Sequence, residues 1–424
     1  MPHKAEQNIG IKLIRFYIFA IFTYGFWVNF LNFTLIIDLS IIATCLYVFI
    51  NNKGKLEYNS ECKVIVQLCG VFIFGVILVA IARCFSIKMS ILGARSYIAY
   101  MIMALGVSNI QLTEKENISI MDTIENLGTA SAAFGIIQFL FNSYMPDILL
   151  HMGSSSIAYV YGLGNLVFRA NGLFENTIVY GGILDALLTF IMARIIYEEK
   201  KKKHLFDAII VFSTIILTFS RVAILGTLGI ILFEILINSR KAIGSRLIKI
   251  VLIIVMIIWI VPTYFSNTVF YKNLIGQSSN TQRSNQVHLE AFDTAQEVLE
   301  DNWICGVGMG TQGYESTGST VKVIRDGTWY TFALELGIPL TALYWVILLM
   351  ILSYIFKRIY EGNASAEQKI YMVSSITAIV FFIISSFMNS SYIARENMAL
   401  SWLLIAFALH NNDASQNIEE FCTN

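Results

Sequence analysis

Long runs of apolar residues, separated by short polar segments, dominate the pattern of hydrophobic and polar positions along the chain. An α-helix of about 20 residues spans roughly 30 Å, which is the thickness of the hydrocarbon layer of a bilayer. Because the runs lack period-two alternation, they predict membrane-spanning helices rather than strands. The pattern predicts twelve such helices, at residues 14–31, 33–50, 64–84, 90–110, 122–141, 177–197, 204–220, 222–238, 247–265, 328–356, 368–388 and 394–410.

The distribution of Lys and Arg predicts how these helices are oriented, because cytoplasmic loops retain positive charge. If both termini lie in the cytoplasm, the cytoplasmic segments hold most of the 29 Lys and Arg residues. The run from Lys200 to Lys203 is then a topology anchor. The first apolar segment continues into a second without a small-residue cleavage site, so we expect an uncleaved first helix.

Two of the predicted outer connections, residues 142–176 and residues 266–327, are too long to be turns. Loops longer than about 15 residues are usually functional or disordered, and the second connection is rich in Gly and Trp rather than in charge. Within it, residues 284–301 carry apolar side chains at helical spacing with polar residues opposite. We therefore expect a single membrane domain over residues 1–424, with a surface helix on its outer face.

The composition agrees with a bilayer as the solvent and excludes several classes of protein. Hydrophobic residues make up 56% of the chain and charged residues 14%, and the mean hydropathy is +0.66, which lies outside the range of soluble domains. The net charge is zero and no basic stripe indicates a nucleic-acid partner. The six cysteines lack the spacing of a disulfide framework or a zinc site, so we expect them to be packing residues. No cofactor is expected.

Four arginines are candidates for ligand binding, because a charge at membrane depth is costly unless it is compensated. Arg95 falls within the fourth predicted helix, and Arg169, Arg221 and Arg395 lie at predicted outer helix ends. A guanidinium presents a planar fork of donors that matches phosphate oxygens. Several of them at one face predict an anionic, lipid-linked ligand with a pyrophosphate. The alternative for each arginine is a structural ion pair, as with Glu396 beside Arg395, or a side chain that reaches to the interface.

Three stretches of the chain carry a recognisable pattern in a defined order. They are Arg169-Ala-Asn-Gly-Leu-Phe-Glu-Asn176, Leu217-Thr-Phe-Ser-Arg-Val-Ala-Ile224, and Glu300-Asp-Asn-Trp-Ile-Cys-Gly-Val-Gly-Met-Gly310 followed by Leu334-Glu-Leu-Gly-Ile338. Together with the predicted helices, they resemble the bacterial O-antigen ligase and O-antigen polymerase family. The first resembles the family's Arg-x-x-Gly-x-Phe signature, the second its Ser-Arg element and the third its large-loop signature.

The resemblance implies an all-α polytopic membrane protein of about 12 transmembrane helices, GT-C-like, with a large extracytoplasmic loop between the ninth and tenth helices. It implies a metal-independent glycosyltransferase of the bacterial inner membrane, with its active site facing outward. The implied donor and acceptor are glycans linked to undecaprenyl pyrophosphate. A chain-length regulator and a flippase are the implied protein partners.

Two departures from the family pattern bear on which branch the chain represents. Thr177 stands where many members have Pro, and Asp326-Gly327-Thr328 stands where the ligases carry a His-Asn pair. A ligase without that His would lack its proposed base, so we favour a polymerase of O-antigen or capsular polysaccharide. The ligase, which transfers polymer to lipid A core, is the nearest alternative. A flippase for lipid-linked sugars is the alternative of another class, although the two halves show no repeat and the charges gather at one face.

We expect Arg169 and Arg221 to hold the donor pyrophosphate, with Arg395 and Arg95 as further candidates. Their charge would stabilise the negative charge that develops on the leaving group as the glycosidic bond breaks.

The candidates for the general base are Asp326, His288 and Glu290. Asp326 is favoured because it occupies the place of the ligase His, although it also fits a turn that caps the tenth helix. Gly172, Gly306 and Gly308 are expected to shape the loops. A nucleotide-binding loop at the last two is excluded, because that motif requires a preceding strand and a following helix.

Overall fold

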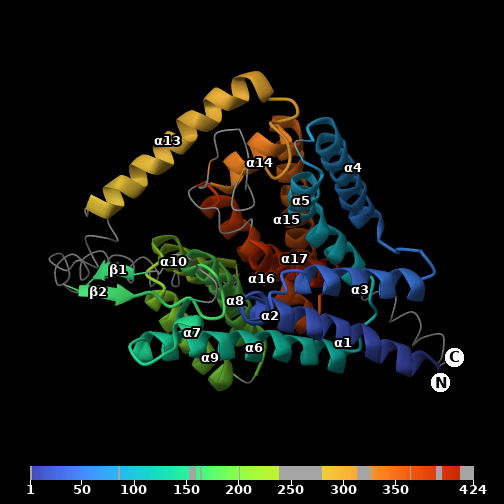
Figure 1. The fold of residues 1–424 in the computed structure, drawn as a ribbon. Helices are drawn as coiled ribbons and strands as arrows, with labels where there is room; N and C mark the ends of the chain where they lie inside the picture. The colour runs from blue at the N-terminus through green and yellow to red at the C-terminus, as the bar shows by residue number, and fades with distance from the viewer. Residues whose placement is uncertain are drawn as a thin grey trace.

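The computed structural model describes residues 2–84, 86–151, 159–162, 165–199, 201–237, 279–312, 324, 327–362, 364–387 and 394–410 (Figure 1). This part of the chain is helical apart from one antiparallel hairpin of β1 (Tyr159–Gly162) and β2 (Asn165–Phe168). The helices are α1 (Pro2–Phe22), α2 (Tyr24–Leu31), α3 (Ile36–Asn51), α4 (Ser60–Ala82), α5 (Ile87–Val107), α6 (Glu114–Phe141), α7 (Asp147–His151), α8 (Thr177–Tyr197), α9 (Lys201–Leu217), α10 (Arg221–Ile237), α13 (Ser279–Asn302), α14 (Thr328–Leu336), α15 (Ile338–Glu361), α16 (Ala366–Ser385) and α17 (Arg395–Leu409).

The predicted all-α, polytopic membrane fold is confirmed. Six described helices, α4, α5, α6, α8, α15 and α16, are long and apolar enough to cross a bilayer. The bent pair of α1 and α2 passes the same test when it is taken as one span, and α3 and the start of α10 are shorter apolar helices. The predicted span at residues 247–265 lies outside the described residues.

The first predicted span, residues 14–31, is a bent pair of helices rather than one straight helix. It consists of α1 and α2, which meet at Thr23 with a bend of 72°. The physical reason is a close approach by another segment, since the Gly25 N–H donates to the Leu173 carbonyl at 2.8 Å. A side chain at Gly25 would lie 2.2 Å from that carbonyl oxygen, so the contact requires glycine.

The predicted helix at residues 328–356 is likewise divided, into α14 and α15. The break falls at Gly337, whose φ of +81° favours glycine. Here the turn after α13 packs against the helix, and the Ile338 N–H donates to the Trp303 carbonyl at 2.8 Å. A Cβ atom at Gly337 would meet the carbonyl oxygen of Ile304 at 2.2 Å.

The helix α8 lies at the centre of the bundle and positions the segments around it. It packs against α6, α9, α10, α16 and α17, and its side chains are buried along nearly the whole length, including the polar Asp185 and Thr189. In contrast, α4 presents most of its apolar side chains to the outside, as a lipid-facing helix does.

Residues 284–301, for which the sequence predicts a surface helix, lie within α13, which is beside α14 and apart from the other helices (Figure 1). Ala295 of α13 is buried with Ile324 and Leu334 in a small apolar cluster, whereas Leu289 and Phe292 are exposed. The helix is thus amphipathic, as the sequence predicts. Its position on the outer membrane surface remains a prediction.

Candidate functional site

The segment of residues 169–176 is held rigidly by side chains from the bundle. Gln138 of α6 accepts from the Gly172 N–H at 2.7 Å and donates to the Gly172 carbonyl at 2.8 Å. Gly172 has a φ of +58°, and a Cβ atom there would lie 2.5 Å from the Tyr180 ring. Phe174 stacks on that ring with centroids 5.2 Å apart. Gly172, which was predicted to shape the loop, is therefore needed both for the backbone conformation and for the close packing against Tyr180.

The same segment packs on the corner between α9 and α10, which carries the second motif with Arg221. Arg169 Nε donates to the carbonyl of Thr218 at 2.7 Å, and the Ala170 N–H donates to the Leu217 carbonyl at 3.0 Å. Thr218 stands three residues before Arg221. Two motifs that are about 50 residues apart thus share one corner of the fold.

The corner itself has an unusual backbone. Phe219 adopts a φ of +50°, which is uncommon for a residue other than glycine. Ser220 follows and caps α10, because its Oγ accepts from the Ala223 N–H at 3.4 Å. Arg221 is then the first residue of α10, at the end where the helix dipole and free N–H groups favour an anion.

The electrostatics of the corner also favour a negatively charged ligand. Within the described part of the chain, the hydrogen bond to Thr218 is the only one that the Arg169 side chain makes. Arg221 makes no ion pair or hydrogen bond there. Burial lowers the pKa of the Arg169 guanidinium to about 10, so the side chain is still charged at neutral pH. Two guanidinium groups with unused donors and a helix N-terminus can together bind a phosphate or pyrophosphate.

The other two candidate arginines have partners within the protein. Arg95 of α5 forms an ion pair with Asp38 of α3 at 3.0 Å. Arg395 donates to the Tyr24 hydroxyl at 2.6 Å and to the Thr34 carbonyl at 2.9 Å. Arg95 thus has the structural ion pair that was its alternative to ligand binding. Arg395 instead ties α17 to the first helices through hydrogen bonds.

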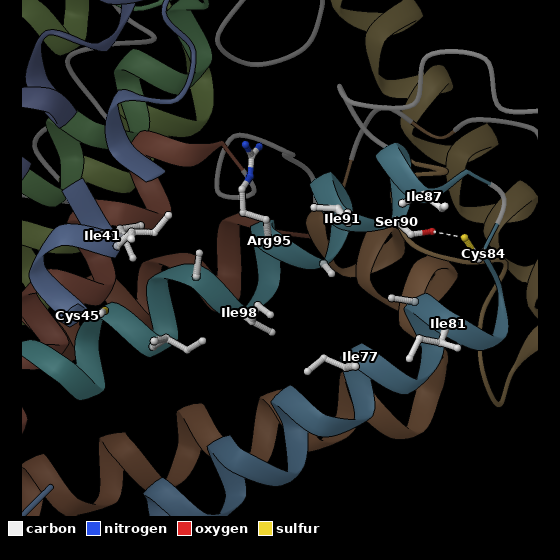
Figure 2. Close-up of a pocket in the computed structure, with 15 residues that line it drawn as sticks. Ile41, Cys45, Ile77, Ile81, Cys84, Ile87, Ser90, Ile91, Arg95 and Ile98 are labelled. Carbon is white, nitrogen blue, oxygen red and sulfur yellow. Dashed lines mark hydrogen bonds between the residues drawn. The ribbon is translucent and has the colours of Figure 1, made fainter. Parts of the chain in front are cut away.

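Beside Arg95 lies an apolar pocket of about 680 Å³ between α3, α4 and α5 (Figure 2). Ile77 and Ile81 of α4 line one wall, and Ile91 and Ile98 of α5 line another. Figure 2 shows the guanidinium of Arg95 pointing away from the isoleucines of α4, so that its aliphatic part borders the pocket. The apolar lining of this pocket suits a hydrocarbon chain rather than a sugar.

The two parts of the large-loop motif come together although the chain between them is long. The Val307 N–H donates to the Leu334 carbonyl. Gly306 and Gly308 both have positive φ, and a Cβ atom would meet Leu334 O at 2.4 Å in the first case and Arg83 O at 2.4 Å in the second. The glycines predicted to shape this loop therefore allow it to pack against α14 and the end of α4.

Glu335 is a residue of this motif to which the sequence reasoning gave no role. Its buried carboxylate accepts from the Tyr97 hydroxyl at 2.7 Å and from the Gln312 N–H at 2.8 Å. It thus fixes the end of the described loop onto α5 and α14. The available signal was a carboxylate within an otherwise apolar predicted span, which usually marks a paired or functional residue.

The described residues place none of the three candidate bases at the arginine corner. Asp326 lies outside the described residues, as does the side chain of His288, whose backbone belongs to α13. Glu290 is exposed on α13 and accepts from Gln286 at 3.1 Å. The base therefore stays a prediction for all three.

Comparison with known proteins matches residues 208–345 to the family model described as O-antigen ligase. No curated protein matches the chain. The matched region runs from α9 through α15 and contains Arg221, the large-loop motif and Glu335. The stretch at residues 169–176 lies before it. Over residues 208–345 the chain is therefore similar to the O-antigen ligase family, whose members act on polysaccharide.

Proposed function

We propose that the protein is a polysaccharide polymerase that joins repeat units linked to undecaprenyl pyrophosphate on the outer face of the bacterial inner membrane. The product would be O-antigen or capsular polysaccharide. The observation that supports this most strongly is the corner between α9 and α10, where Arg169 donates to Thr218, three residues before Arg221, and Arg221 is unpaired among the described residues. This corner has the chemistry of a pyrophosphate site.

In the proposed reaction a hydroxyl of the acceptor sugar attacks the anomeric carbon of the donor. The new glycosidic bond forms, the bond from that carbon to the pyrophosphate oxygen breaks, and undecaprenyl pyrophosphate leaves with the electron pair. Arg169 and Arg221 stabilise the charge that grows on the leaving group. Asp326, with His288 and Glu290 as alternatives, accepts the proton of the hydroxyl. The pocket between α3, α4 and α5 is a suitable place for part of the lipid chain.

The orientation follows the charge distribution of the loops, with both termini in the cytoplasm and the large loop outside. In that orientation Lys200 to Lys203 lie inside and the arginine corner lies outside. A flippase would deliver the lipid-linked units to this face, and a chain-length regulator would limit the product.

The second candidate is the O-antigen ligase, which the description of the matching family favours. The residues Asp326-Gly327-Thr328 in place of a His-Asn pair favour the polymerase instead. A deletion strain separates the two, because loss of a polymerase leaves single repeat units on the lipid A core, whereas loss of a ligase leaves none.

The test of the pyrophosphate site is complementation of that strain with Arg169→Ala and Arg221→Ala at matched expression. Loss of one preorganised donor of this kind costs roughly 100-fold or more in rate, so the ladder of long chains on a polysaccharide gel should disappear. Arg83→Ala is the matched control, because Arg83 is an exposed arginine at the predicted outer end of α4. Normal ladders from both corner variants would contradict the proposal.

A further inference from the structure

A second cluster of ionisable side chains joins α6, α8 and α9 away from the arginine corner. Arg194 of α8 donates to Asp122 at 2.8 Å, to Glu198 at 2.7 Å and to Glu125. Arg194 comes 17 residues after Thr177, the first residue of α8, so the cluster lies roughly 26 Å along this helix from the segment of residues 169–176. It belongs to the opposite end of the bundle and has no part in the proposed glycosyl transfer.

The contacts of His204 resemble those of a histidine that binds a metal ion. Its Nδ1 lies 2.7 Å from Glu125 Oε1, and its Nε2 lies 3.0 Å from Glu198 Oε2. A metal-binding histidine ordinarily donates its second ring N–H to a carboxylate, which is the position of Glu198. One ligand atom from each of Glu125, His204 and Asp207 lies within 4.8 Å of the others, and all three residues are buried.

An independent observation points to a cation at the same place. Asp207 is 7% exposed, and its buried Oδ2 accepts no hydrogen bond from a donor group of the described residues; the carboxylate of Glu125 is its neighbour instead. A buried carboxylate oxygen without a partner carries a full desolvation cost. A cation between Asp207 and Glu125 would remove this cost.

The net charge of the cluster matches that of a divalent cation. Four carboxylates meet here, those of Asp122, Glu125, Glu198 and Asp207, against the cations Arg194 and Lys203, which donates to Asn126 at 3.0 Å. With His204 neutral, as a ligand must be, two negative charges remain. We propose that Glu125, His204 and Asp207 bind a divalent transition-metal ion such as Zn²⁺, and that Glu198 fixes the ring of His204.

Imidazole and carboxylate ligands suit Zn²⁺, Co²⁺ and Mn²⁺. The ion joins α6 to the first turns of α9 and stabilises the predicted cytoplasmic end of the bundle. Binding to the folded state raises the stability of that state by mass action.

The test uses the full chain, purified in detergent, stripped with EDTA and dialysed against micromolar ZnCl₂. Metal analysis should find about one zinc per chain, and zinc should raise Tm by several degrees. Asp207→Asn and His204→Gln should lose the zinc and the rise in Tm. His410→Ala is the control and should retain both, because His410 is a histidine at the end of α17 that contacts the Ser108 carbonyl instead.

If the two variants fail to fold, Co²⁺ titration of the unmodified chain decides the matter through the visible absorption bands of bound cobalt. Saturable bands that zinc abolishes would support the site. An unmodified chain that retains no zinc and gives no cobalt bands would overturn it, and protons would then bridge the carboxylates. Retention of zinc by Asp207→Asn and His204→Gln at the control level would also overturn it.

Discussion

The four candidate arginines differ in what surrounds their guanidinium groups. Arg95 and Arg395 are bound to Asp38, Tyr24 and the Thr34 carbonyl, and such contacts are typical of arginines that hold helices together. Arg169 donates one hydrogen bond to the α9–α10 corner, and Arg221 donates none within the described part of the chain. Because a free guanidinium in a partly buried place is costly, the second pair is the better candidate for a ligand.

At the residue scale, Gly172→Ala should destabilise the protein more than Gly362→Ala. Both glycines have positive φ, at +58° and +82°, but a Cβ atom at Gly362 meets nothing within 4 Å, whereas one at Gly172 would lie 2.5 Å from Tyr180. Both substitutions therefore lose about 1 kcal/mol of folding stability to backbone strain. Only Gly172→Ala adds a steric clash with the Tyr180 ring. Thermal unfolding in detergent measures the difference in stability. Equal losses in Tm would contradict the prediction and show that the Tyr180 ring moves aside without cost.

At the scale of elements, two predicted spans are broken helices. At each break, the backbone of one of the motif segments packs against the helix. Between α1 and α2 the chain accepts the segment of residues 169–176, through Gly25 and Leu173. Between α14 and α15 it accepts the turn of residues 303–305, through Gly337. A straight helix in either place would leave no room for the motif backbone, so the breaks position the candidate site.

This arrangement predicts that Gly25→Ala lowers activity without preventing membrane insertion. The added methyl group would meet the Leu173 carbonyl oxygen at 2.2 Å and displace the segment that carries Arg169. We expect a loss of roughly 10-fold or more in polymer, because small displacements of positioning groups cost this much. Gly70→Ala in α4 is the control, since nothing lies within 4 Å of its Cβ position. Gel analysis of the polysaccharide compares the two, and an unchanged ladder for Gly25→Ala would contradict the assigned role of the break.

At the scale of the whole molecule, the two ends of α8 carry two different clusters of charge. The end at Asn176 adjoins the corner with unused guanidinium donors, and the end at Arg194 holds a buried group in which carboxylates outnumber cations. In the proposed orientation the first faces outward and the second faces the cytoplasm. In that orientation the membrane would separate the proposed site for an anionic substrate from the proposed cation site.

The orientation predicts which native cysteines a membrane-impermeant maleimide can reach in spheroplasts. Cys84, which is exposed at the end of α4, should react from outside in a Cys305→Ser background. Cys422, near the C-terminus, should react after the membrane is permeabilised. A further Cys84→Ser change should remove the labelling of intact spheroplasts, and labelling of Cys422 without permeabilisation would reverse the orientation.

The sequence by itself determined the membrane class and most of the helix positions, and its motifs gave the resemblance to the O-antigen ligase and polymerase family. Long apolar runs and local motifs can be read in this way because they depend on neighbouring residues alone. Helices α4, α5, α6, α8, α15 and α16 all fall on predicted spans, and the match at residues 208–345 confirms the resemblance over that region. The amphipathic helix α13 was likewise readable from its periodicity.

The tertiary structure alone decided which side chains meet. The contact of Arg169 with Thr218 spans 49 residues, that of Tyr97 with Glu335 spans 238, and that of Glu125 with His204 spans 79. No local pattern encodes such pairs, since they depend on how the helices pack. For the same reason the breaks at Thr23 and Gly337 escaped prediction, because each is caused by a segment far away in the chain that needs its backbone to come close.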